Sequence, residues 1–205
     1  MISKKERVIG MAQQLEIEFK NLLSKEEYEA LCTTFAIPNE DFHEQANHYF
    51  DTADFRLKKA HSGLRIREVQ NRFECTLKEP AAGIGLLETT DLLTEEHVNA
   101  VLNGATLKAD EVDIRLKKLQ INPSDLQLLG TLFTKRAEIK YNGGLLVFDH
   151  SRYLDTDDYE LEFEVTNEET GRIIFEEFLA KHSIPIRVAD KKIARFMAAV
   201  NKKRG

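Results

Sequence analysis

Polar and apolar side chains alternate along much of the chain, as they do in a β-strand with one buried face. The first such stretch is QLEIEFK at 14–20, where charged residues at 16, 18 and 20 alternate with Leu, Ile and Phe. Further strands are predicted at 45–52, 63–68, 72–78, 83–93, 131–141, 145–149 and 159–165. Most of their connections are short, which favours antiparallel neighbours. The pattern therefore predicts an antiparallel sheet of about eight strands that can close into a barrel.

Helices are predicted between and after these strands. Ser24 followed by Glu27 is a capping-box pattern, so a helix is expected at about 24–36, and Pro38 marks its end. N-cap residues and apolar stripes indicate further helices at about 95–102, 110–121, 168–182 and 190–201. The stripes are interpreted as packing faces. The expected fold class is α+β, a closed eight-stranded antiparallel β-barrel with helices packed outside.

Length and charge limit the organisation and the partners. The chain has 205 residues and no Gly/Ser-rich linker, so a single domain over 1–205 is expected, with its core at about 14–200. The formal net charge of −6 argues against a general nucleic-acid-binding surface. A local basic pocket remains compatible with that charge, because steering by a cleft depends on local charge.

The cysteines and the N-terminal segment suggest a location. Cys32 and Cys75 form no CxxC pair, so a disulfide scaffold is not expected and a reducing compartment fits. The stretch MISKKERVIGMA has no apolar core long enough for a signal peptide, and no apolar run reaches membrane-spanning length. A soluble cytoplasmic protein without a membrane partner is expected.

The charged faces differ in sign from strand to strand. Acids are concentrated on the first and last predicted strands, and bases on the strands between them. A single charged face is typical of any sheet with one solvated side. Taken together, the acidic rows could bind a hard divalent cation, and the guanidinium and ammonium groups could bind phosphate oxygens. A metal combined with a basic clamp is what phosphoryl transfer requires, so a charged cavity for that chemistry is predicted.

An ordered set of short motifs accompanies this pattern. The chain carries, in order, ExExK at 16–20, YFDT at 49–52, LRIRE at 64–68, TLK at 76–78, TKRAE at 134–138, FD at 148–149, ELEFEV at 160–165 and KKIARF at 191–196. With these motifs it resembles the CYTH superfamily, the triphosphate tunnel metalloenzymes, over roughly residues 14–200. The arrangement is most similar to the small single-domain bacterial members. The resemblance implies an eight-stranded antiparallel β-tunnel lined with charged side chains.

The resemblance also implies roles for individual residues. The implied ligands of Mg²⁺ or Mn²⁺ are Glu16, Glu18, Asp149, Glu160 and Glu162. The implied triphosphate-binding residues are Lys20, Arg65, Arg67, Lys78, Arg136 and Lys192. The implied catalytic residues are Glu18, Lys20, Asp149 and Glu162. Lys191 stands where relatives often carry a small polar residue, so the choice between Lys191 and Lys192 stays open, as do the roles of Glu88 and Glu164.

Three functions are compatible with these residues. The leading hypothesis is metal-dependent hydrolysis of a small-molecule triphosphate, either inorganic tripolyphosphate or an organic triphosphate or nucleotide. The alternatives are a class IV adenylate cyclase that makes cyclic AMP from ATP, and a non-catalytic protein that binds polyphosphate or nucleotide. A homodimer is compatible with each. Other chemistries lack their signatures, since the sequence has neither GxxxxGK[ST] nor HExxH.

Overall fold

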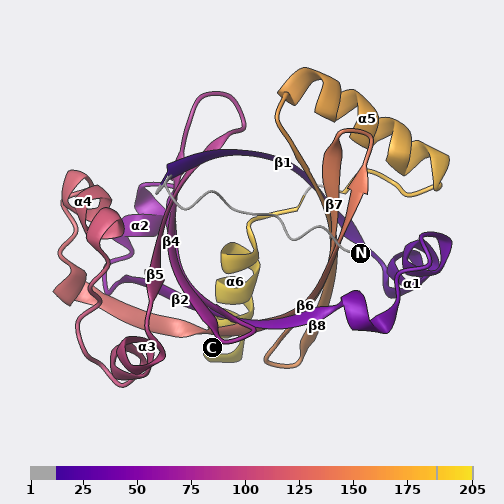
Figure 1. The fold of residues 1–205 in the computed structure, drawn as a ribbon. Helices are drawn as coiled ribbons and strands as arrows, with labels where there is room; N and C mark the ends of the chain where they lie inside the picture. The colour runs from indigo at the N-terminus through magenta and orange to yellow at the C-terminus, as the bar shows by residue number, and fades with distance from the viewer. Residues whose placement is uncertain (1–12, 188, 205) are drawn as a thin grey trace.

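Eight antiparallel strands close into a barrel in the part of the chain that the computed structural model describes, residues 13–187 and 189–204 (Figure 1). The strands are β1 (Gln13–Leu23), β2 (His43–Thr52), β3 (Gly63–Val69), β4 (Arg72–Pro80), β5 (Leu86–Leu93), β6 (Leu126–Tyr141), β7 (Gly144–Tyr153) and β8 (Thr156–Val165). Their order around the barrel is β1-β5-β4-β3-β2-β6-β7-β8. The predicted barrel is confirmed. In this order β1 and β8 are neighbours, and β3 lies opposite β8.

The helices are α1 (Lys25–Thr34), α2 (Arg56–Lys59), α3 (Glu95–Leu102), α4 (Asp110–Lys118), α5 (Glu168–Lys181) and α6 (Lys192–Arg204). The predicted capping box is present at α1, where Ser24 Oγ accepts from the Glu27 backbone N–H and the Glu27 carboxylate accepts from that of Ser24. The one-turn helix α2 was not predicted. The Asp51 carboxylate at the end of β2 holds it by accepting backbone N–H groups of Leu57 and Lys58.

Some element boundaries differ from the prediction. The strand expected at 131–141 begins at Leu126, and the strand expected at 145–149 continues to Tyr153. The strand expected at 83–93 begins only at Leu86, because Gly83 has a positive φ of 65° and lies in the preceding turn. None of these differences moves a side chain to the other face of the sheet, so the predicted alternation holds.

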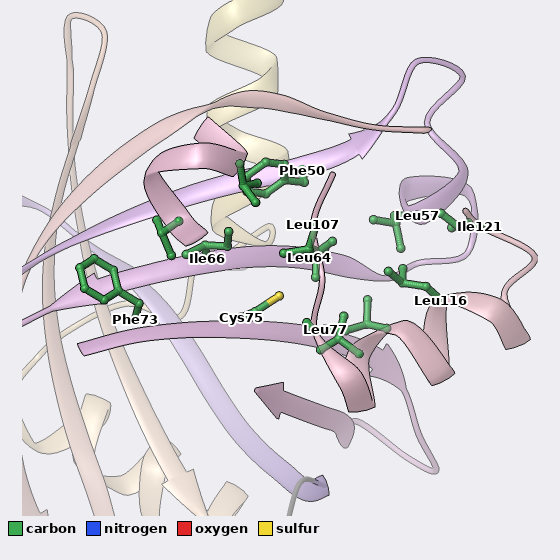
Figure 2. Packing of buried hydrophobic residues seen from close by; sticks show 14 residues of the cluster. Phe50, Leu57, Leu64, Ile66, Phe73, Cys75, Leu77, Leu107, Leu116 and Ile121 are labelled. Carbon is green, nitrogen blue, oxygen red and sulfur yellow. The ribbon is translucent and has the colours of Figure 1, made fainter. Parts of the chain in front are cut away.

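The apolar faces of the strands point outward under the helices. Leu64, Ile66 and Leu77 are fully buried in a cluster between β2–β5 and the helices α3 and α4 (Figure 2). On the other side of the barrel, Phe148 and Phe163 are fully buried in a second cluster with α1 and α5. Because the cores lie outside the barrel wall, the charged faces point into its interior.

Helix α6 packs differently from the other helices and is seen through the ring of strands in Figure 1. Its Phe196 is 4% exposed and packs against Tyr49, Leu132 and Tyr153, which belong to β2, β6 and β7. The Phe196 ring fits there because position 130 is glycine: a Cβ at Gly130 would lie 2.5 Å from the ring. Among the described residues, no helix is long and apolar enough to cross a membrane.

Candidate active site

The interior of the barrel encloses a cavity of about 520 Å³ with charged walls. Its charged lining residues are Glu16, Glu18, Lys20, Arg65, Arg67, Lys78, Glu88, Arg136, Glu138, Asp149, Glu162, Glu164, Lys191 and Lys192. Glu160 is 1% exposed and reaches this set through its ion pair with Lys192. The fold therefore brings all the site residues predicted from the sequence to one tunnel, because each occupies the inward position of its strand or the first turn of α6.

A cluster of carboxylates lies where β7 and β8 meet α6. Oxygen atoms of Asp149, Glu160 and Glu162 lie within 4.8 Å of one another. The Lys192 Nζ is 2.5 Å from an oxygen of Asp149, 2.6 Å from Glu160 and 2.7 Å from Glu162. Burial alone would raise the pKa of Glu162, but the cations of Lys192, Lys20 and Arg136 hold it well below its ordinary value. Glu162 is therefore ionised at neutral pH.

Lys20 connects this cluster to the acids of β1. Its Nζ is 2.9 Å from Glu18 Oε1 and 2.9 Å from Glu162 Oε1, because Lys20 and Glu162 are direct partners in the β1–β8 ladder. Although burial would lower the pKa of Lys20, these carboxylates raise it well above its ordinary value. The Lys20 and Lys192 ammonium groups thus occupy a place with a strong preference for positive charge.

The donor set fits a hard divalent cation. All its ligand atoms are carboxylate oxygens, which Mg²⁺ and Mn²⁺ prefer. Asp149, Glu160 and Glu162, whose oxygens lie within 4.8 Å of one another, are the residues that could hold such an ion. Two ammonium groups already pair with oxygens of this cluster, so a bound ion would compete with Lys20 and Lys192 for them.

A smaller acidic group lies at the β1–β5 side of the tunnel. The Lys78 ammonium is 2.5 Å from Glu16 Oε2 and also pairs with Glu88. Burial, together with the charges of Glu18 and Glu88, raises the pKa of Glu16 to about 7. Burial opposes ionisation of Glu88 as well, but Lys78 and Arg65 lower its pKa to about 2. Glu88 is therefore the more acidic of the two carboxyls.

The opposite wall carries two arginines that make no ion pair within the described residues. Burial lowers the pKa of Arg65, but Tyr49 and the carboxylates of Glu88 and Glu16 raise it overall from a longer distance. Arg65 and Arg67 lie on β3, across the barrel from β8. Within the described residues, neither guanidinium is within 4.0 Å of a carboxylate, and Arg65 Nε has no hydrogen-bond partner. Arg67 donates one long hydrogen bond, 3.3 Å from its Nε to Asn47 Oδ1. Burial and the positive charges of Arg65 and Arg136 lower the pKa of Arg67 to about 9. This wall is prepared to accept an anion.

Arg136 provides a contrast on the same side of the tunnel. It makes a bidentate ion pair with Asp149, at 2.7 and 2.5 Å, and a further contact of 2.9 Å with Glu162. Burial would lower the pKa of Arg136, but Asp149 and Glu162 raise it well above its ordinary value. Arg136 is therefore a compensated charge that fixes two of the carboxylates in position.

The structure separates Lys191, which directly precedes α6, from Lys192, the first residue of the helix. Lys192 enters the carboxylate cluster, whereas Lys191 donates from Nζ to the backbone oxygen of His61 at 2.8 Å while lining the tunnel. Burial and the nearby Lys78 and Lys20 lower the pKa of Lys191. Lys191 thus has the surroundings of an anion ligand, and Lys192 those of a counter-ion for carboxylates.

Sequence reasoning did not identify Arg195 as part of this site. Its Nε is 2.7 Å from Asp158 Oδ2 and its Nη2 is 2.6 Å from Glu160 Oε2. No alternation in the sequence marks it, because it stands in a helix between the apolar residues of a packing stripe. Asn47 was also missed, although a signal existed: Gln45, Asn47 and Tyr49 share the inward face of β2.

Comparisons with known proteins agree with this geometry. The CYTH domain family matches residues 14–197. The protein named "Putative triphosphatase YjbK" of Bacillus subtilis (strain 168) is 45% identical over 186 residues, which cover 91% of this chain and 96% of that protein. A crystal structure from Bacillus halodurans, described as a putative adenylate cyclase, is also 45% identical, with a TM-score of 0.87 over 91% of this chain and 99% of that one.

A more distant structure shares the fold. It is HpAC1 from Hippeastrum, described as a putative adenylyl cyclase with a dominant triphosphatase activity, at 23% identity and a TM-score of 0.76 over 90% of this chain and 95% of that one. Together, the match over nearly the whole chain and the two relatives at 45% identity show that this chain belongs to the CYTH domain family.

Proposed function

We propose that this protein hydrolyses a triphosphate inside its tunnel with the aid of a divalent metal ion, Mg²⁺ or Mn²⁺. One observation carries the proposal. Arg65 and Arg67 face the carboxylates of β8 across an enclosed cavity of about 520 Å³, and neither has a carboxylate within ion-pair distance in the described residues. A chain of phosphates supplies the negative charge that this wall lacks, and a metal can join its other oxygens to the acids.

The proposed roles follow from charge and position. The acids Glu16, Glu18, Asp149, Glu160 and Glu162 would hold the metal. The cations Lys20, Arg65, Arg67, Lys78, Arg136 and Lys192 would bind the phosphates, and the position of Lys191 adds it to this set. The bound metal would neutralise charge on the phosphate oxygens and favour attack by water.

The remaining chemistry belongs to the chain itself. Arg65 and Arg67 would fix the phosphates by charge-assisted hydrogen bonds and stabilise negative charge as the phosphoanhydride bond breaks. Glu18 would orient the attacking water, and Lys20, 2.9 Å from Glu18, would hold that carboxylate in place and stabilise the departing phosphate.

The name of one relative supports a triphosphatase activity. The Bacillus subtilis relative, whose length this chain nearly covers at 45% identity, bears the name "Putative triphosphatase". The substrate of the present protein and its dependence on a metal remain our proposal.

Phosphate release tests the proposal directly. Wild-type protein should release phosphate from tripolyphosphate with Mg²⁺ or Mn²⁺ and not with EDTA, and Glu162→Gln and Glu18→Gln should each lower kcat by about 100-fold or more. Glu169→Gln, at an exposed position of α5, is the matched control and should retain full activity. Undiminished turnover in the Glu18→Gln/Glu162→Gln double variant would refute the assignment.

A second candidate is an adenylate cyclase, because the Bacillus halodurans structure at 45% identity is described as a putative one. In a cyclase the nucleophile is the ribose 3′-hydroxyl in place of water. Incubation with ATP and Mg²⁺ or Mn²⁺, followed by chromatography, separates the two activities. Cyclic AMP with pyrophosphate would favour the cyclase, and ADP with phosphate the hydrolase.

A further inference from the structure

A second cavity of about 470 Å³ lies against the outer side of β1, next to the tunnel. Its walls come from β1, from α5, from the β4–β5 turn and from the segment that precedes α6. We call it the side compartment. Four residues line both this compartment and the tunnel, namely Glu18, Lys20, Leu86 and Lys191. The two cavities therefore adjoin at the proposed catalytic residues.

The strand pairing explains why the barrel wall is thin there. The β1–β5 ladder runs from Gln13, opposite Thr89, to Glu16, opposite Leu86, which is the first residue of β5. Beyond Glu16, the ladder of β1 in the described residues continues with β8 alone, through Leu23. The edge of β1 that faces β5 is thus free of strand partners beside Glu18 and Lys20.

Further along β1, this edge is closed again by the segment before α6. The Asn21 side chain donates to the Pro185 backbone oxygen at 3.1 Å and accepts from the Arg187 backbone N–H at 2.6 Å. Asn21 is fully buried, so this attachment is firm. The side opening is therefore confined to the short stretch between the β4–β5 turn and residue 187.

The side compartment is more apolar than the tunnel, although Arg172, Glu176 and Arg187 also line it. Its apolar lining includes Ile84, Leu86, Phe175, Leu179 and Ile186. Ile84 is 40% exposed and Ile186 is 70% exposed, so large aliphatic side chains stand open at its rim. An apolar surface that directly adjoins a highly charged channel suits a ligand with an apolar end and an anionic end.

We propose that the substrate is an organic triphosphate, whose phosphates lie in the tunnel while an apolar ring at its other end occupies the side compartment. This inference rests on the proposed function of the tunnel. The compartment's volume is within the usual range for small-molecule sites, about 300–1,000 Å³. Inorganic tripolyphosphate has no group that would use this apolar surface.

Filling the compartment from its rim tests the proposal. Glu176 lines the compartment from an exposed position of α5, and Glu177, its exposed neighbour, does not. Glu176→Trp is the test variant and Glu177→Trp its matched control. Isothermal titration calorimetry without divalent metal would measure Kd for tripolyphosphate and for two ring-bearing probes, ATP and thiamine triphosphate. This readout does not require turnover.

We expect wild-type protein to bind at least one ring-bearing probe about tenfold more tightly than tripolyphosphate, and Glu176→Trp to abolish that advantage while leaving the Kd for tripolyphosphate unchanged. Glu177→Trp should match wild type. The proposal is overturned if Glu176→Trp and Glu177→Trp bind each ring-bearing probe with the same Kd. It is also overturned if Glu176→Trp weakens tripolyphosphate binding as much as it weakens binding of the ring-bearing probes.

A second pair of variants removes apolar surface in place of adding bulk. The double variant Ile84→Ser/Ile186→Ser should weaken binding of the preferred ring-bearing probe about tenfold. The control is Ile173→Ser, which should leave binding unchanged, because Ile173 lies on α5 outside the compartment and is 53% exposed. If these variants bind the probe equally well, the inference is contradicted. If selective binding is found but no triphosphate is hydrolysed with any metal, the proposed hydrolysis fails while the ring site stands.

Discussion

Replacing Arg67 by Met should make the protein more stable and less able to bind a triphosphate. Arg67 is a cation in the interior of the barrel whose one hydrogen bond among the described residues is the 3.3 Å contact with Asn47. Methionine has a similar stem and no charge to desolvate. A gain in stability together with a loss of triphosphate binding is expected only if the Arg67 guanidinium serves to bind an anionic ligand.

The size of the effect follows from the pKa of Arg67, which is lowered from 12.5 to about 9. At about 1.36 kcal/mol per pKa unit, this difference corresponds to about 5 kcal/mol against the charged form. A base whose folded pKa lies below its unfolded value destabilises the folded state wherever both states are protonated, which includes pH 7. Water in the tunnel and the hydrogen bond to Asn47 offset part of this cost, so we expect a gain of about 1–3 kcal/mol in the free energy of unfolding.

Urea denaturation measures the change in the free energy of unfolding. Calorimetry with tripolyphosphate should show a Kd about 10- to 100-fold larger in Arg67→Met, as expected for loss of hydrogen bonds from a charged group. Arg136→Met is the contrasting variant. It should lower the free energy of unfolding, because it removes a buried cation that pairs with both Asp149 and Glu162 and leaves more of their negative charge to Lys192. If Arg67→Met destabilised the ligand-free protein as Arg136→Met does, the assignment of an uncompensated anion-binding wall would be refuted.

Three further changes probe other parts of the molecule. Because burial raises the pKa of Glu16 to about 7, Mn²⁺ affinity measured by calorimetry should rise with pH up to about 8, and Glu16→Gln should flatten this dependence. The same group should make the metal-free protein less stable in urea as pH rises from about 4.5 to 7, because the folded state holds the proton more tightly. Asp51→Ala removes the acceptor of three backbone N–H groups and should lower the free energy of unfolding by about 2–3 kcal/mol in urea, with no change in the Kd for tripolyphosphate. Phe196→Ala should cost about 3 kcal/mol of packing, seen as faster amide hydrogen exchange in α6; unchanged exchange there would contradict its role in docking the helix.

The strands and the tunnel could be predicted because alternation assigns each side chain to a face. Glu16, Glu18 and Lys20 were placed together by their spacing of two, and the barrel does direct them inward. Alternation carries no information about which strands pair. The β1–β8 ladder, which sets Lys20 opposite Glu162, joins segments 142 residues apart and depends on closure of the whole barrel.

Helical parts of the site were harder to predict for a different reason. Lys191 and Lys192 are adjacent in sequence, and a small rotation at the start of α6 decides which one enters the carboxylate cluster. Helix α2 has only one turn, so its apolar pattern is too short to recognise, and its formation depends on Asp51 from a neighbouring strand. These features depend on tertiary contacts that no local pattern contains.

The placement of the cores outside the barrel explains how a charged interior can be tolerated. In β7, Phe148 and Asp149 are adjacent and both fully buried, yet they point to opposite sides of the wall. Burial of Phe148 under α1 and α5 stabilises the strand, while Asp149 is stabilised by its contacts with Arg136 and Lys192. Because the two faces are separated by the sheet, tunnel charges can be exchanged for other residues without altering the two apolar clusters outside the barrel. If the proposed function holds, exchanges among the inward-facing residues would change what the tunnel binds while the barrel itself stays the same.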